Sequence, residues 1–221
     1  MNLRLTSPLT SFAALTLALA FVMPGDVRAD EALFNSSGCN GCHYTDGPAH
    51  EKTIDDQMAK KGPELWYAGS KFQQPWLQAW LQDPQPIRPM AYNSLTEKNP
   101  NNHPKMDAAG AASMTGFLMS LTSADVEAGT VKAKKNPKGK LIFTKKMPCS
   151  GCHKFSNRGN VTGGLSGPSL VGAGTRLNHD WILAYLQKPM TFKPVKAMPN
   201  FTGLLSDKDM INVARFVASF E

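Results

Sequence analysis

Two short stretches with the same pattern lie in opposite halves of the chain. Residues 39–43 read Cys-Asn-Gly-Cys-His, and residues 149–153 read Cys-Ser-Gly-Cys-His, so each is a C-x-x-C-H box. The two boxes contain all four cysteines of the 221-residue chain. We therefore expect both halves to be built around the same kind of site.

The pattern of each box is typical of covalent haem attachment. The two thiols add to the vinyl groups of a haem, and the histidine that follows them binds the haem iron. The sequence therefore predicts two haem c groups in one chain. The predicted tethers are Cys39, Cys42, Cys149 and Cys152, and the predicted proximal ligands are His43 and His153.

Two other kinds of site use the same residue types. A structural zinc site gathers four ligands at one point, whereas here each pair of cysteines belongs to its own half of the chain. A redox-active C-x-x-C pair of the thioredoxin type lies beside a β-α-β pattern, and the sequence has no such pattern. The spacing favours haem over both alternatives.

The sequence also repeats around the boxes. Residues 62–84 align without a gap with residues 167–189, every position being displaced by 105. Within this window Gly, Pro, Leu, Ala, Gly, Trp, Ala, Leu, Gln and Pro recur identically. We therefore predict a tandem duplication, with a first domain at residues 30–122, a lysine-rich linker at 123–139 and a second domain at 140–221.

The N-terminus is typical of an exported protein. Arg4 precedes an apolar run over residues 12–23, which is followed by a small-residue boundary at Ala29. The run is shorter than the roughly 20 residues that a membrane-spanning helix needs. We therefore predict a signal peptide at residues 1–29, cleaved after Ala29, and a periplasmic location for the remaining chain.

The pattern of apolar residues indicates an all-α fold. No stretch alternates apolar and polar residues for long enough to predict a sheet. The final helix is predicted to start at Ser206, and its counterpart in the first copy spans residues 107–121. Residues 93–105 are rich in Asn and Pro and occur only in the first copy, so we expect a surface insertion there. The linker is expected to be solvated, because glycine, proline and lysine dominate it.

These motifs resemble class I cytochrome c domains. The resemblance rests on the paired boxes, on the Gly-Pro-x-Leu segments that begin at Gly62 and Gly167, and on a methionine in a proline-rich loop. It covers nearly all of the chain that follows the signal peptide. It implies a small helical fold around each haem, in which the backbone carbonyls of Pro63 and Pro168 accept the N–H of the proximal histidines.

The resemblance also implies a methionine as the sixth ligand of each iron. In the second copy, Met198 precedes Pro199 and lies 45 residues after His153. In the first copy, Met90 lies 47 residues after His43 in a comparable loop. Met90 and Met198 are therefore the predicted sixth ligands.

The first site has competing candidates for this ligand. Met90 is followed by Ala91, where the resemblance leads us to expect proline. Met106 and His103 lie 63 and 60 residues after His43, near the end of the insertion. The sequence leaves both of them open beside Met90.

Ligation by histidine and methionine predicts electron transfer. It fills both axial positions of the iron, and the thioether raises the reduction potential. We expect an electron shuttle, or the cytochrome subunit of an oxidoreductase or respiratory chain. The alternative is a di-haem enzyme of the peroxidase or thiosulfate-oxidising type, with a histidine ligand or an open position at the first haem. A thiolate-ligated variant is excluded, because no cysteine lies outside the boxes.

The charge pattern suggests the kind of partner. The chain has a formal charge of +7, and lysines crowd the linker and the approach to the second box. We therefore expect redox-protein donors and acceptors, with an acidic partner docking at the lysine-rich face. Nucleic acid is not expected, because the lysines are not interleaved with aromatic residues. The sequence leaves loose membrane association open and does not indicate an oligomeric state. The basic residues of this face are Lys132, Lys134, Lys135, Lys138, Lys140, Lys145, Lys146 and Arg158.

Overall fold

The computed structural model describes residues 27–195 and 198–221. Most of the predicted signal peptide lies outside these residues. Helix α1 (Val27–Ser36) begins two residues before the predicted cleavage point at Ala29. Within the described ranges, no helix has the length and apolar character needed to cross a membrane.

Helices form both halves of the chain. In the first half, α5 begins where expected, because the Asp107 side chain accepts a hydrogen bond from the backbone N–H of Gly110 and so caps the helix. Helix α1 packs across α5, with the rings of Phe34 and Phe117 5.7 Å apart. The helices of this half are α1, a 3-10 turn at Cys39–Gly41, α2 (Ile54–Ala59), α3 (Ala68–Lys71), α4 (Gln74–Gln82) and α5 (Ala108–Ser120).

The second half repeats this pairing of an early and a late helix. Its early helix packs so closely against α11 that a Cβ on Gly139 would lie 2.1 Å from the backbone oxygen of Asn212. The final helix is capped by Ser206, as the sequence predicts. The helical elements of this half are α6 (Pro137–Leu141), a π-helical turn at Ile142–Lys146, α7 (Cys149–Cys152), α8 (Ala173–Arg176), α9 (His179–Gln187), α10 (Pro189–Phe192) and α11 (Asp207–Val217).

A small hairpin departs from the all-α expectation. Strands β1 (Phe155–Asn157) and β2 (Asn160–Thr162) pair antiparallel directly after the second box. The two residues between them, Arg158 and Gly159, have φ values of 52° and 82°. Positive φ at both central positions is the geometry of a tight hairpin turn, for which glycine and asparagine are favoured. Nearly all of the regular secondary structure in the described residues is nevertheless helical.

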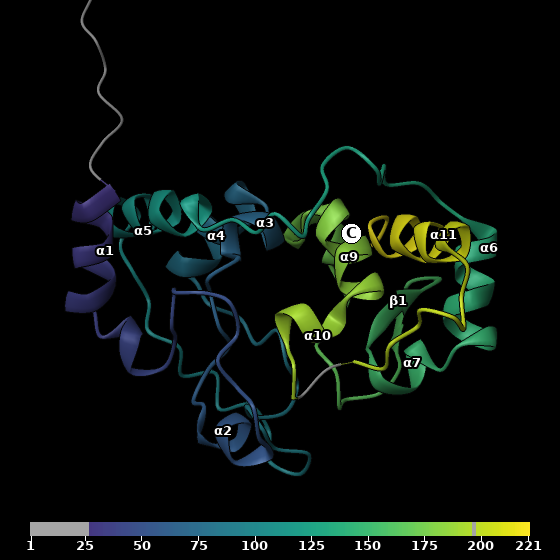
Figure 1. Ribbon diagram of the computed structural model, residues 1–221, viewed down its shortest axis with the longest axis horizontal. Coiled ribbons are helices and arrows are strands. Elements are labelled where there is room, and N and C mark those ends of the chain that lie inside the picture. The colour runs from purple at the N-terminus through teal and green to yellow at the C-terminus, as the bar shows by residue number, and fades with distance from the viewer. Residues whose placement is uncertain (1–26, 196–197) are drawn as a thin grey trace, which may run out of the picture.

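The two halves meet at a reciprocal seam. Phe72 and Leu177, which correspond in the 105-residue displacement, face each other in an antiparallel bridge. The Gln73 N–H donates to the Arg176 carbonyl at 2.9 Å, and the Asn178 N–H donates to the Lys71 carbonyl at 2.8 Å. These two bonds join corresponding positions in opposite directions, so the seam has local two-fold symmetry. Figure 1 shows α1 and α5 at one end of the molecule, α6 and α11 at the other, and α3 and α9 between them.

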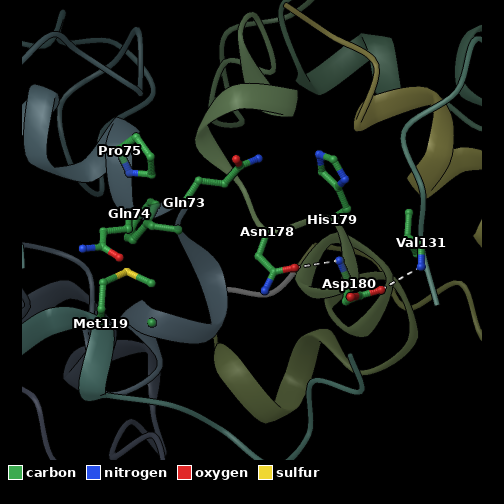
Figure 2. Close-up of a pocket in the computed structure, with 10 residues that line it drawn as sticks. Gln73, Gln74, Pro75, Met119, Val131, Asn178, His179 and Asp180 are labelled. Atoms are coloured by element: carbon green, nitrogen blue, oxygen red, sulfur yellow. Dashed lines mark hydrogen bonds between the residues drawn. The ribbon is translucent and has the colours of Figure 1, made fainter. Parts of the chain in front are cut away.

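The predicted linker is held against the second half. The Asp180 carboxylate on α9 accepts the backbone N–H groups of Gly129 and Val131, each at 2.7 Å, and Figure 2 shows this side chain directed at Val131. The Val131 side chain is only 5% exposed. Helix α6 begins at Pro137, three residues before the predicted start of the second domain, because Asn136 caps it. The expectation of a solvated linker is therefore wrong at Val131, which is buried and attached to α9, whereas residues 132–135 are exposed as the sequence predicts.

Replacement of Asp180 tests this attachment. We expect Asp180→Ala to expose the linker to trypsin, which cleaves after its lysines. The substitution removes two hydrogen bonds to a charged group. The loss of about 1.5 kcal/mol from one of them is enough to raise the equilibrium population of the locally opened linker roughly tenfold. The control is Asp125→Ala, which removes a surface ion pair with Lys188 at 3.4 Å and an exposed 3.5 Å hydrogen bond from the Ser123 hydroxyl. Equal cleavage rates in both variants would contradict the attachment.

Candidate haem-binding sites

The second box presents one free ring nitrogen of its histidine. His153 follows α7, and its backbone N–H donates to the Cys149 carbonyl at 3.0 Å. Its Nδ1 lies 2.7 Å from the Pro168 carbonyl, which can only accept, so Nδ1 carries the proton and Nε2 is left unprotonated. Burial lowers the pKa of His153. The ring is thus a neutral imidazole with Nε2 available to a metal.

A glycine makes this contact possible. A Cβ on Gly167 would lie 2.7 Å from the Nδ1 and Cε1 atoms of His153. No side chain larger than hydrogen fits there without moving the ring. The Gly-Pro pair therefore supplies both the space for the imidazole and the carbonyl that orients it.

The first box has the same arrangement. The His43 N–H donates to the Cys39 carbonyl at 2.9 Å, and His43 Nδ1 donates to the Pro63 carbonyl at 2.6 Å. A Cβ on Gly62 would lie 2.6 Å from the His43 ring. Burial lowers the pKa of His43 as well. In both predicted proximal histidines, Nδ1 is bonded to a proline carbonyl, and Nε2 points away from that carbonyl.

The cysteines do not have the properties of a redox-active dithiol. All four are free thiols, and burial raises the pKa of Cys149 to about 11 and that of Cys39 in the same direction. A nucleophilic C-x-x-C pair depends instead on a lowered thiol pKa. Among the described residues, no cluster of three or more His, Cys, Asp or Glu side chains could hold a metal ion. The structure thus favours neither the dithiol nor the zinc alternative.

A family comparison agrees with this geometry in the second half. Residues 135–217 match the family described as cytochrome C oxidase, cbb3-type, subunit III. This region is a cytochrome c domain. The chain shows no significant similarity to a curated protein or to a solved structure. The cytochrome c domain implies covalently bound haem c, redox-protein partners and a role in electron transfer.

The seam offers groups that fit the anionic edge of such a haem. Arg176 is 6% exposed, and within the described ranges no carboxylate pairs with it. The guanidinium lies 5.9 Å from the centre of the Trp76 ring, and reciprocally Lys71 Nζ lies 5.1 Å from that of Trp181. The buried Nε1 of Trp181 has no hydrogen-bond partner among the residues that the structure describes. Haem propionates are the kind of anion that would satisfy these groups, because buried cations and donors need partners.

The predicted methionine ligands lie in different surroundings. Met198 is half-buried and packs against the core of the second half. Met90 is also half-buried, but it lies opposite Lys98 in an isolated antiparallel bridge at the base of the insertion. The roles of both as ligands stay predictions.

The two alternatives at the first site also differ. Met106 packs against the core beside α5, where methionine commonly fills irregular space. His103 is exposed, and its ring centroid lies 6.2 Å from that of His43. The His103 ring is thus near the proximal histidine of the first box.

An open groove at the seam is separate from these sites. Its volume is ≈ 370 Å³, and Figure 2 shows that residues of α4, α5 and α9 line it. None of the predicted tethers or ligands is among its lining residues. These are Gly69, Phe72, Gln73, Gln74, Pro75, Met119, Val131, Asn178, His179 and Asp180.

A buried charge cluster links the halves near both sites. The Glu64 side chain is fully buried, and its carboxylate contacts Lys60 Nζ and Lys193 Nζ at 2.5 Å each. The Tyr67 hydroxyl donates to the same carboxylate at 2.7 Å. Burial by itself would raise the pKa of Glu64, but Lys193 and Lys60 outweigh it and hold this pKa at about 2. The sequence gives no signal for this cluster, because Glu64 and Lys193 come from different halves.

The glycine beside His153 yields the first test of the site. We expect Gly167→Ala to displace the ring, break the bond to Pro168 and move the ferric absorption spectrum toward the high-spin form. The steric cost of such overpacking is about 1–3 kcal/mol. The control is Gly151→Ala, because the nearest atom to that Cβ is 3.9 Å away. A Gly167→Ala spectrum identical to that of the control would show that the ring does not depend on this space.

Lys193 yields a test of the buried cluster. We expect Lys193→Met to lower the free energy of unfolding by about 3 kcal/mol or more, because it leaves the Glu64 carboxylate short of one buried partner. Lys188→Met is the control, since Lys188 pairs with Asp125 only at the surface. Denaturant titration of the two variants measures the difference. Equal losses would mean that the cluster does not stabilise the seam.

Proposed function

We propose that this chain is an exported electron-transfer protein with two covalently bound haem c groups, one in each half. The observation that carries the proposal is the repeated His-Pro-Gly arrangement. The second half matches a cytochrome family at residues 135–217, and the first half has the same contacts around its own box, to within 0.1 Å in the Nδ1 to carbonyl distance. The 105-residue displacement and the reciprocal seam support a tandem duplication.

The chain's own residues divide the work at each proposed site. Haem supplies the one-electron ferric/ferrous chemistry when it is bound. The cysteines of each box tether it, and His43 or His153 provides the fifth ligand from a ring whose orientation the proline carbonyl holds. Met198 provides the sixth ligand at the second site. With the iron held by two side chains of the protein, no position would be left for a substrate, which favours an electron carrier over a peroxidase or a thiosulfate-oxidising enzyme.

The proposed domain limits combine the predicted cleavage point with the described helices. The first domain extends from residue 30 to residue 122, and the second comprises α6 to α11. The linker ends at Asn136, the cap of α6. The N-terminal 29 residues direct export to the periplasm, where the protein acts as a free shuttle or as the cytochrome subunit of an oxidoreductase or respiratory chain.

The partner surface is the lysine-rich linker. Asp209 contacts Lys138 and Lys146 at 2.7 and 3.5 Å and so offsets part of the charge near the second box. Lys132, Lys134 and Lys135 are exposed, and in the part of the chain that the structure describes no carboxylate pairs with them. An acidic redox partner would be attracted to this segment at long range.

The number of haems tests the proposed function most simply. We expect an iron-to-chain ratio of two in the mature protein, and of one in either double variant, Cys39→Ala/Cys42→Ala or Cys149→Ala/Cys152→Ala, because each loses one pair of tethers. In the unmodified protein, a redox-protein donor should reduce both haems, so that the whole of the haem absorbance changes to that of the reduced form. A ratio of one that only the second double variant abolishes would contradict the two-haem proposal.

Ionic strength tests the partner surface. We expect the bimolecular rate of electron transfer with an acidic donor protein to fall as salt rises. The variant Lys132→Gln/Lys134→Gln/Lys135→Gln should lower that rate and flatten its salt dependence. The control removes the same charge from the first half, in Lys52→Gln/Lys61→Gln/Lys98→Gln. Equal effects of the two sets would remove the linker from the docking surface.

A further inference from the structure

A His-Pro pair precedes the final helix of the first half, as a Met-Pro pair precedes that of the second. His103 lies four residues before Asp107, the cap of α5, and Met198 lies eight residues before Ser206, the cap of α11. In both halves the residue just before the cap is apolar, Met106 or Leu205. In its position relative to the final helix, His103 is therefore closer to Met198 than Met90 is.

The separation of two rings matches that of two ligands on one metal ion. The centroids of His43 and His103 are 6.2 Å apart. A metal ion held between the two rings, with one nitrogen of each ring about 2 Å away on opposite sides, would place the centroids roughly 6 Å apart, because each nitrogen lies about 1 Å from its ring centre. The two planes are inclined by 45°, which bonding through a single nitrogen on each ring allows.

The hydrogen bonds of His103 leave the correct nitrogen free. Its Nδ1 lies 2.9 Å from the carbonyl of Pro104, as His43 Nδ1 and His153 Nδ1 lie near the carbonyls of Pro63 and Pro168. A carbonyl oxygen only accepts, so Nδ1 of His103 is the donor, and in the neutral ring Nε2 is then the free acceptor. The other two histidines make their contacts through Nε2. His50 Nε2 contacts the Asp46 carboxylate, and His179 Nε2 contacts the Gly174 carbonyl.

Neighbouring residues hold this ring near His43. The Trp80 ring on α4 lies 4.7 Å from the His103 ring, and the Trp80 Nε1 group donates to the Gln85 carbonyl at 2.8 Å. The Met106 N–H donates to the Leu81 carbonyl at 3.0 Å and so attaches the end of the insertion to α4. The position of His103 is thus set by a helix of the haem domain and not by the insertion alone.

Met90 is held by a different set of contacts. The segment around it pairs with residues 97–99, with the Ala91 N–H donating to Glu97 and the Asn99 N–H donating to Pro89. Met90 itself faces Lys98 across this pair. These bonds hold Met90 in a small bridge of the insertion, whereas the ring contact to the proximal histidine is made by His103.

We propose that His103, and not Met90, is the sixth ligand of the first iron, so that the first site has two histidine ligands and the second has one histidine and one methionine. This inference rests on the proposed function, because it requires a haem at the first box. Two imidazoles also fill both axial positions, so the first site remains closed to substrates. Replacing a thioether by an imidazole lowers the reduction potential, which places the first site below the second.

Spectra of the oxidised mature protein test the assignment. The iron-to-chain ratio is measured first, because a value of one contradicts the two-haem proposal whatever the ligands are. With two irons, we expect a methionine-to-iron charge-transfer band whose intensity corresponds to one methionine-ligated haem per chain. Electron paramagnetic resonance should show a second low-spin signal, of the bis-histidine type. Met198→Leu should abolish the band, and the matched variant Met90→Leu should leave both signals unchanged.

Replacement of His103 gives the opposite pattern. We expect His103→Gly to convert half of the iron to the high-spin form and added imidazole to restore the low-spin signal, a rescue that a purely structural role would not produce. If His103→Gly does not accumulate, His103→Met is the second variant. It should double the charge-transfer band, because both irons would then have a methionine ligand. Two methionine-ligated haems in the unmodified protein, one of them lost in Met90→Leu, would overturn the proposal. So would an unmodified protein in which half of the iron is already high-spin.

Discussion

The hydrogen bond between a proximal histidine and a proline carbonyl is the contact on which both sites depend. It assigns the proton to Nδ1, leaves Nε2 for a metal and fixes the plane of the ring. The same bond occurs at His43 and His153, at 2.6 and 2.7 Å, and in each case the preceding glycine gives the ring its space. A change at any of the three positions would disturb the ligand without touching the cysteines.

The reciprocal seam brings the two halves together on the side where haem propionates would lie. Each half contributes one cation that stacks over a tryptophan of the other, Lys71 over Trp181 and Arg176 over Trp76. The Glu64 and Lys193 pair adds a buried ionic contact between the segment that follows Pro63 and the loop that leads to Met198. Charged groups whose partners lie across the seam therefore connect the two sites. A change of charge at one proposed haem would shift the electrostatic potential at the other.

The sequence predicted those features that local patterns encode. The boxes, the repeat and the starts of the two final helices at Asp107 and Ser206 are all visible over short stretches of chain, and in the structure these two residues cap α5 and α11. The hairpin after the second box escaped prediction because its strands have only three residues each, although the Arg158-Gly159 turn was a signal for it.

These local patterns could not predict contacts between residues that are far apart in the sequence. The bonds from Asp180 to the linker cross about 50 residues, and Glu64 and Lys193 are 129 residues apart, so no periodicity relates them. His103 is an intermediate case. The His-Pro pair was present in the sequence, but the expectation of methionine ranked Met90 above it, and only the distance between two rings shows how close His103 lies to the box.

A potentiometric titration of the mature protein, followed by its haem absorbance, distinguishes two different haems from one. We expect two one-electron steps of equal amplitude, with the proposed bis-histidine haem reduced at the lower potential and the methionine-ligated haem at the higher. A single one-electron step that contains the whole absorbance change, in a protein with one iron per chain, would contradict this expectation.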